Sequence, residues 1–178
     1  MIRIFNLTFL VFLFLITKAS SLIEIDITRG NLDPLPIAVS PLFQDDNSKK
    51  NSINEIKVEN VGSEISSVVE NNLKTSGLFN PLSKEAFLQK PDIAHLKPRF
   101  EDWALIKAQA LITGKVTIEN KKLKVEFRLW DILAGREMMA LAFTTVPSNW
   151  RRVGHIISDK VYERLTGEKG YFDTRIIY

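Results

Sequence analysis

The sequence contains no cysteine and only two histidines, His95 and His155, among its 178 residues. Without cysteine the chain has no disulfide, no zinc-thiolate site and no cysteine nucleophile. Two histidines are also too few for a histidine-rich metal site. We therefore expect no catalytic, cofactor-binding or metal-binding residues.

Excess charge of one sign is also lacking, because 24 basic residues stand against 21 acidic ones. Arg3 and Lys18 lie in a segment that we expect to be removed, and without them the balance is nearly neutral. A nucleic-acid-binding protein needs a basic surface, so this class is disfavoured. Hydrophobic residues make up 45% of the chain, an ordinary share for one globular domain of modest size.

Long apolar runs are absent as well. The apolar run from Leu7 to Ile16 is well short of the roughly 20 residues that span a bilayer. Arg3 precedes this run, and the small residues from Ala19 to Ser21 follow it. This layout predicts a secretory signal peptide at residues 1–21, with cleavage after Ser21 or, alternatively, after Ala19. No cysteine follows for lipid attachment, so we expect a soluble mature protein in an exported compartment, with no membrane span after cleavage.

The clearest structural pattern is a three-strand antiparallel meander across residues 110–146. Apolar and charged residues alternate along its middle strand, a period of two that places one face in the core and the other in water. Short connections at residues 120–122 and 133–136 have the length and chemistry of turns. The apolar residues of the middle strand are Leu123, Val125, Phe127 and Leu129.

Two long helices are predicted, one on each side of the meander in sequence. The first spans residues 59–76, has apolar residues at helical spacing and ends at Gly77. The second begins at Ser148, which we expect to be its N-cap, and ends at Gly167. We expect both helices to cover the apolar face of the meander.

Shorter elements are expected before and after the first helix. Residues 36–43 form an apolar strand between two prolines, which restrict it to a sheet edge or to strand ends. Residues 44–54 are polar and predict a loop, and its Asp45-Asp46-Asn47 run lacks the spacing of a calcium loop. Residues 100–107 predict a short helix that delivers Trp103 and Ile106 to the core.

Charged residues on the second helix allow two interpretations. Arg151 and Arg152 lie in its first turn, where the helix dipole disfavours cations, so they are a solvated pair or mark a contact surface. His155 and Asp159 are four residues apart, a spacing that would allow them to pair on the surface. No nucleophile accompanies them, so they do not form a catalytic triad.

The stretch after the signal peptide alternates apolar and polar residues from Ile23 to Ile27 and turns at Gly30. It is either an edge strand of the domain's own sheet or a free strand that adds to a partner's open sheet edge. Backbone hydrogen bonds would supply affinity in the second case, and alternate side chains would set the register. Periodicity alone favours the first interpretation.

Two stretches of the chain are specific: Leu73-Lys74-Thr75-Ser76-Gly77-Leu78-Phe79-Asn80-Pro81-Leu82 and Leu165-Thr166-Gly167-Glu168-Lys169-Gly170. With these motifs the chain resembles the TolB amino-terminal domain family. The resemblance covers nearly the whole mature chain. It implies an α/β (α+β) domain at residues 35–168, in which two long helices pack on a mixed, mainly antiparallel sheet. The other matching stretches are Ile23–Ile27 with Pro36–Val39, Trp150–Asp159, and Phe172–Ile176.

The resemblance implies a periplasmic adaptor of the Tol-Pal system that works by protein contact, not as an enzyme. The family supports outer-membrane integrity and envelope invagination during cell division. Its mature N-terminal segment reaches TolA and corresponds here to residues 22–34, which favours the partner-strand interpretation. The partner-binding residues expected on this basis are Leu22, Ile23, Glu24, Ile25, Asp26, Ile27, Thr28, Arg29, Gly30, Asn31, Leu32 and Asp33.

In the family the chain continues into a β-propeller that binds Pal. Residues 169–178 correspond to the start of that propeller, and the sequence ends there, so we do not expect Pal binding from these residues. The alternative function is a small periplasmic enzyme or ligand-binding α/β domain, which needs acid, base or nucleophile groups converging in a cleft. A pocket holding two or more of Asp26, Asp131, His95 and His155 would support that alternative.

Overall fold

Three ten-residue strands form the centre of the fold: β4 (Ala110–Glu119), β5 (Lys122–Asp131) and β6 (Arg136–Thr145). They are antiparallel neighbours, so the predicted meander is confirmed. The computed structural model describes Ile23 and residues 33–174. The predicted signal peptide and most of the segment 22–34 lie outside these residues.

The first hairpin has a two-residue turn in which Asn120 and Lys121 adopt φ of 50° and 58°. Two positive φ values in succession match the twist of the flanking strands. The second turn contains Gly135 at a φ of 63°. The inward side chains of β5 are buried, Leu123, Val125 and Leu129 completely, which confirms the predicted strand phase.

The whole sheet has the order β3-β1-β4-β5-β6, and the strands outside the meander pair in parallel. Strand β1 (Leu35–Val39) lies between β3 (Phe79–Pro81) and β4, and β2 (Phe43–Gln44) pairs with β4 beyond the end of β1. The predicted strand at 36–43 is thus two strands. β1 is an interior strand, and Pro36 and Pro41 lie near its two ends. The sequence had restricted these prolines to a sheet edge or to strand ends, and the structure shows the second. β3 was not predicted.

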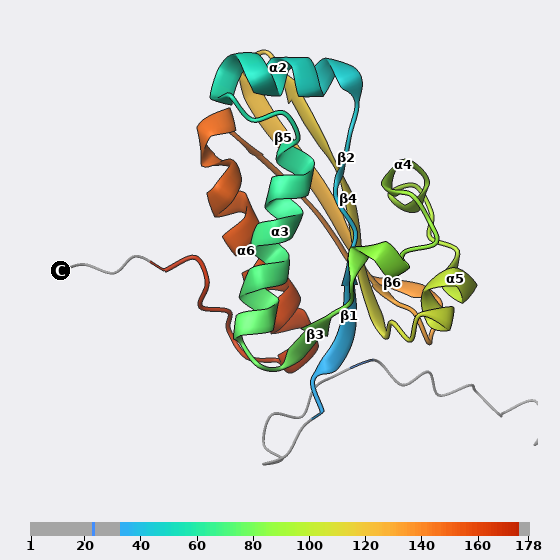
Figure 1. Ribbon diagram of the computed structural model, residues 1–178. Coiled ribbons are helices and arrows are strands. Elements are labelled where there is room, and N and C mark those ends of the chain that lie inside the picture. The colour runs from blue at the N-terminus through green and yellow to red at the C-terminus, as the bar shows by residue number, and fades with distance from the viewer. Residues whose placement is uncertain (1–22, 24–32, 175–178) are drawn as a thin grey trace, which may run out of the picture.

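The two long helices cover one face of the sheet (Figure 1). Helix α3 spans Val61–Thr75 and helix α6 spans Trp150–Thr166, so both predicted helices are confirmed. Gly154 of α6 allows the two helices to pack closely, since a Cβ at this position would lie only 2.8 Å from Val68 Cγ1 of α3. The main core cluster lies between this pair and the sheet.

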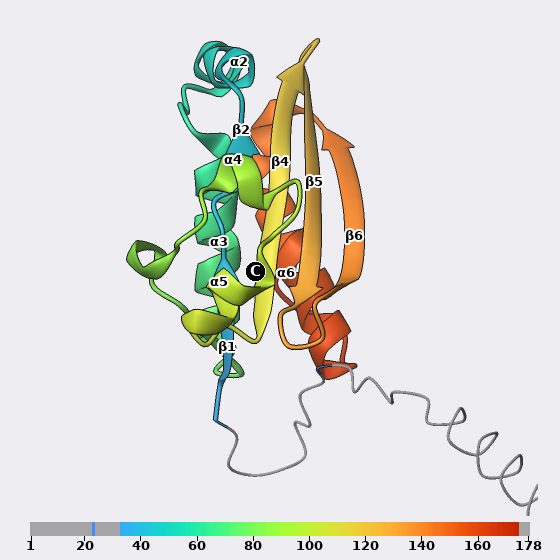
Figure 2. The same cartoon turned by 90° about the vertical axis from the view of Figure 1, so that its right-hand side faces the viewer.

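Short elements lie on the opposite face, as Figure 2 shows. They are the 3-10 turn η1 (Lys84–Ala86) and the helices α4 (Pro91–Ala94) and α5 (Phe100–Leu105). Trp103 of α5 is 1% exposed and belongs to a second, smaller core cluster, as predicted. Its indole Nε1 donates to Gln89 Oε1 at 3.0 Å.

The predicted loop at residues 44–54 is wrong, because helix α2 spans Asp46–Ile56. Asp45 is its N-cap and accepts from the Ser48 backbone N–H at 2.8 Å. The buried stripe of this helix consists of Ser48 and Ser52, so apolar periodicity could not reveal it. Ser48 Oγ accepts from the Ile118 backbone N–H, which anchors α2 to the end of β4.

The predicted N-cap of the second long helix is also wrong. Ser148 lies within a 3-10 turn, η2 (Pro147–Asn149), and α6 begins only after Asn149. Neither η2 nor α6 has a side-chain hydrogen bond at its N-cap. The proline at the start of η2 lacks a backbone N–H, so one of the donors that a cap would satisfy is absent there.

The predicted domain 35–168 contains every strand and helix of the described part of the chain. No helix in residues 33–174 has both the length and the apolar character required to cross a membrane. The sheet is mixed and most of its ladder is antiparallel, with two long helices on one face, so the predicted α+β class is confirmed.

Candidate partner-binding site

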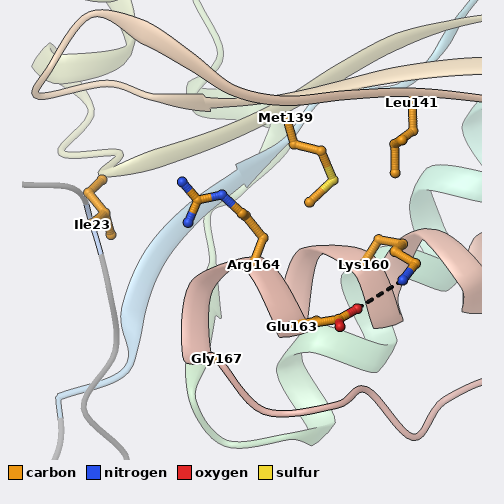
Figure 3. A pocket seen from close by; sticks show the side chains of 7 residues that line it. All are labelled: Ile23, Met139, Leu141, Lys160, Glu163, Arg164 and Gly167. Carbon is orange, nitrogen blue, oxygen red and sulfur yellow. Dashed lines mark hydrogen bonds and ion pairs between the residues drawn. The ribbon is translucent and has the colours of Figure 1, made fainter.

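A groove of 570 Å³ lies between strand β6 and helix α6 (Figure 3). Met139 and Leu141 extend from β6 toward the helix and form its apolar wall. Leu141 is 38% exposed, so α6 leaves this part of the sheet partly uncovered. The remaining lining residues are Ile23, Lys160, Glu163, Arg164 and Gly167.

The helix side of the groove is charged. Lys160 Nζ and Glu163 Oε2 form an ion pair at 2.9 Å, and both side chains are nearly half exposed. Such a pair contributes little to stability, so it can rearrange around a ligand at small cost. Arg164 adds a second cation, whose Nε lies 3.4 Å from the Met138 carbonyl oxygen. The groove thus combines an apolar wall with two cations and one anion.

Strand β6 is the last strand in the sheet order, and its outer edge pairs with no strand in the described ranges. Residues 138–145 contain no charge and no proline. Natural edge strands commonly carry charged residues or proline, which prevent pairing with another chain. Without this protection, the backbone N–H and C=O groups along the edge of β6 can accept a further strand.

Ile23 lies in this groove. It is partly buried and packs against the main core cluster. Of the twelve predicted partner-binding residues, only Ile23 and Asp33 are described, and Asp33 is exposed. The others lie outside the described residues, so the segment's role stays a prediction. The groove itself was missed, because it depends on how far α6 extends over β6.

The residues that could support an enzyme lie in separate places. Asp131 is fully buried, and its Oδ1 accepts from the Ala134 backbone N–H at 2.8 Å. His155 Nδ1 lies 2.9 Å from Asn72 Nδ2. His95 stacks on Phe43 at a ring-centroid distance of 4.6 Å. The fourth residue, Asp26, lies outside the described part of the chain.

The surface pair that the spacing of His155 and Asp159 allows does not form, because each residue has another partner. Asp159 instead accepts backbone hydrogen bonds from Phe172 and Asp173. His155 faces α3, because the close helix contact at Gly154 brings Asn72 within hydrogen-bond distance. Within residues 33–174, no group of three or more His, Asp and Glu residues could hold a metal ion.

Local hydrogen bonds lower the pKa values of Asp45 and Glu126. The Ser48 backbone N–H lowers the pKa of Asp45 by stabilising its carboxylate. A hydrogen bond from Lys124 lowers the pKa of Glu126 on the exposed face of β5. These carboxylates stabilise a helix end and a sheet surface, and neither lines the groove.

Within the described residues, the domain is an α+β fold with an unpaired sheet edge and a groove beside it, and extended peptides can join such an edge. The family model described as the TolB amino-terminal domain matches residues 23–138. The chain therefore belongs to the TolB amino-terminal domain family.

One relative is the Tol-Pal system protein TolB of Pelagibacter ubique (strain HTCC1062), which is 75% identical over 170 residues. That match covers 96% of this chain and 38% of the relative, so the chain spans well under half of the relative's length. The crystal structure of TolB from Acinetobacter baumannii shares the fold, with a TM-score of 0.62 and 22% identity. It aligns with 79% of this chain, which covers 30% of that structure.

Proposed function

We propose that this chain is a periplasmic adaptor module of the Tol-Pal system that binds TolA through residues 22–33. The observation that carries the proposal is membership of the TolB amino-terminal domain family, together with a Tol-Pal relative 75% identical to the chain. In this role the module helps to maintain the outer membrane and to draw the envelope inward at division. TolA, and not Pal, is the partner assigned to these residues.

The chemistry of the segment fits strand addition. Ile23, Ile25 and Ile27 alternate with Glu24 and Asp26, so a strand here would present an apolar side and an acidic side. An extended peptide that joins a sheet edge gains affinity from backbone hydrogen bonds and specificity from its alternate side chains. Because Ile23 is partly buried in the groove, a partner that takes this side chain must replace its contacts there.

The separation of Asp131, His95 and His155 gives no support to the alternative of a small enzyme or ligand-binding domain. General acid–base chemistry needs groups within hydrogen-bond reach of one bound substrate. Protein contact requires only an accessible segment and a stable domain that carries it.

Calorimetric titration tests the proposal with chains that begin at Leu22 and at Pro34, each against the periplasmic C-terminal domain of TolA. The longer chain is expected to bind and the shorter one is not. Replacing Ile23, Ile25 and Ile27 with Asp should abolish binding, because it removes the apolar side. Replacing Glu24 with Gln and Asp26 with Asn is the matched control and should preserve it. Absence of detectable binding by the longer chain at high micromolar concentration would refute the assignment.

A further inference from the structure

The segment that follows helix α6 folds back along it. Gly167 ends the helix at a φ of 76°, a conformation that reverses the chain direction. Residues 167–174 then run beside α6 toward its start, as the red end of the ribbon in Figure 1 shows. Arg152 and Asp159 of α6 both bind this segment. They are seven residues apart, about 10 Å along the helix and on one side of it.

The inner contact is made by Asp159. Its Oδ1 accepts from the Phe172 backbone N–H at 2.7 Å, and its Oδ2 accepts from the Asp173 backbone N–H at 3.1 Å. One carboxylate therefore satisfies two consecutive backbone donors, and hydrogen bonds to a charged acceptor are stronger than neutral ones. Asp159 is partly buried, which limits the competition from water.

Side-chain packing supports the same contact. Tyr162 is 8% exposed, and its ring centroid lies 5.5 Å from that of Tyr171 and 5.8 Å from that of Phe172. A Cβ on Gly170 would lie 2.4 Å from Asp159 Cα, so the chain approaches the helix more closely than any side chain allows. Together, the hydrogen bonds, the aromatic packing and the glycine contact hold residues 170–173 against α6.

The outer contact is an ion pair between Arg152 and Asp173. Arg152 Nε and Nη2 donate to the Asp173 carboxylate at 3.1 to 3.2 Å, in a two-pronged arrangement. The Arg152 side chain is 55% exposed and that of Asp173 is 27% exposed. Exposed ion pairs are weak and are screened by salt, whereas the inner contact is shielded by packing. The neighbouring Arg151 makes a different contact, since its guanidinium lies over the Trp150 ring.

We propose that residues 167–174 are a strap that locks onto α6 in two stages and fixes where the chain leaves the domain. The inner stage, at Asp159 and Gly170, sets the direction of the outgoing chain. The outer stage, at Arg152, opens separately and frees the last residues of the strap. Thr174 is thus held at the side of α6. The strap takes no part in the proposed TolA contact, so the two proposals fail independently.

Residue-resolved hydrogen exchange on the full chain tests the two stages. Asp159→Ala is expected to raise exchange at the Phe172 and Asp173 amides about tenfold or more. Gly170→Ala should do the same without removing a charge. Arg152→Gln should raise exchange at Asp173 by less than Asp159→Ala does, because the Asp173 N–H keeps its hydrogen bond to Asp159, and it should leave Phe172 protected. Arg151→Gln is the matched control and should change neither amide.

Two readouts keep the result interpretable. Amides of β5 report on the core, and they must stay protected in every variant that is scored. Trypsin cleavage after Lys169 should be faster in the Asp159 and Gly170 variants only. High salt should reproduce the effect of Arg152→Gln in the unmodified chain. Unchanged exchange in Gly170→Ala, or equal opening of both stages in Arg152→Gln, would overturn the proposal.

Discussion

Replacing Phe127 with Ala tests the packing of the sheet directly. Phe127 is 1% exposed in the middle of β5, and its ring stacks on Phe143 of β6 at a centroid distance of 6.1 Å. Truncating a buried phenylalanine costs about 3 to 5 kcal/mol, because transfer free energy is lost and a cavity is left. A domain of ordinary stability, about 5 to 15 kcal/mol, would lose a large part of its free energy of unfolding.

Urea denaturation followed by circular dichroism measures this loss as a lower midpoint at an unchanged slope. Glu126→Ala is the matched control one residue away, on the opposite face of the same strand. Glu126 pairs with Lys124 at 2.7 Å, but both side chains are about half exposed, so its removal should cost less than about 1 kcal/mol. Equal and small effects of the two substitutions would refute the assignment of the β5 faces.

Three further substitutions test other contacts. Asp45→Ala should cost about 1 kcal/mol of unfolding free energy at neutral pH. The pKa of Asp45 is lowered in the folded state, so its stabilisation is complete above the ordinary pKa of 3.8 and is lost as the pH falls through the folded pKa. Urea titrations of the variant and the parent should therefore converge in acid. Gly154→Ala should lower the free energy of unfolding by about 1 to 3 kcal/mol, measured as a lower thermal midpoint, since its Cβ would meet Val68 at 2.8 Å. Gln89→Leu should lower the free energy of unfolding measured in urea by on the order of 2 kcal/mol, because Gln89 Oε1 accepts from both Trp103 Nε1 and the Arg99 backbone N–H. Gln89→Glu keeps an acceptor at this position and should cost less.

Much of the fold follows from local patterns. The alternation in β5 and the apolar stripes of α3 and α6 depend only on the periods of strand and helix, so the sequence could predict them. Helix α2 escaped prediction because its buried positions are serines that hydrogen bond to β4 and to the Val58 carbonyl oxygen. Ile118 is far from Ser48 in sequence, and Val58 lies in a loop, so no periodic pattern marks these hydrogen-bond partners.

The candidate site divides in the same way. Residues 22–33 are predicted from their alternation and from the family resemblance, since both are properties of a continuous stretch. The groove between Met139 and Arg164 was not found, because it arises where two separate elements fail to cover each other fully.

The sequence by itself determined the helix and strand periods, the turn chemistry and the family, because each depends on neighbouring residues. Only the tertiary structure decided that β1 lies inside the sheet, that Asp159 binds the chain after α6 and that β6 is the edge strand among the residues that the structure describes. The physical reason is that these features depend on contacts between residues distant in sequence. Hydrogen-bond partners of that kind are set by packing, and local propensity does not specify them.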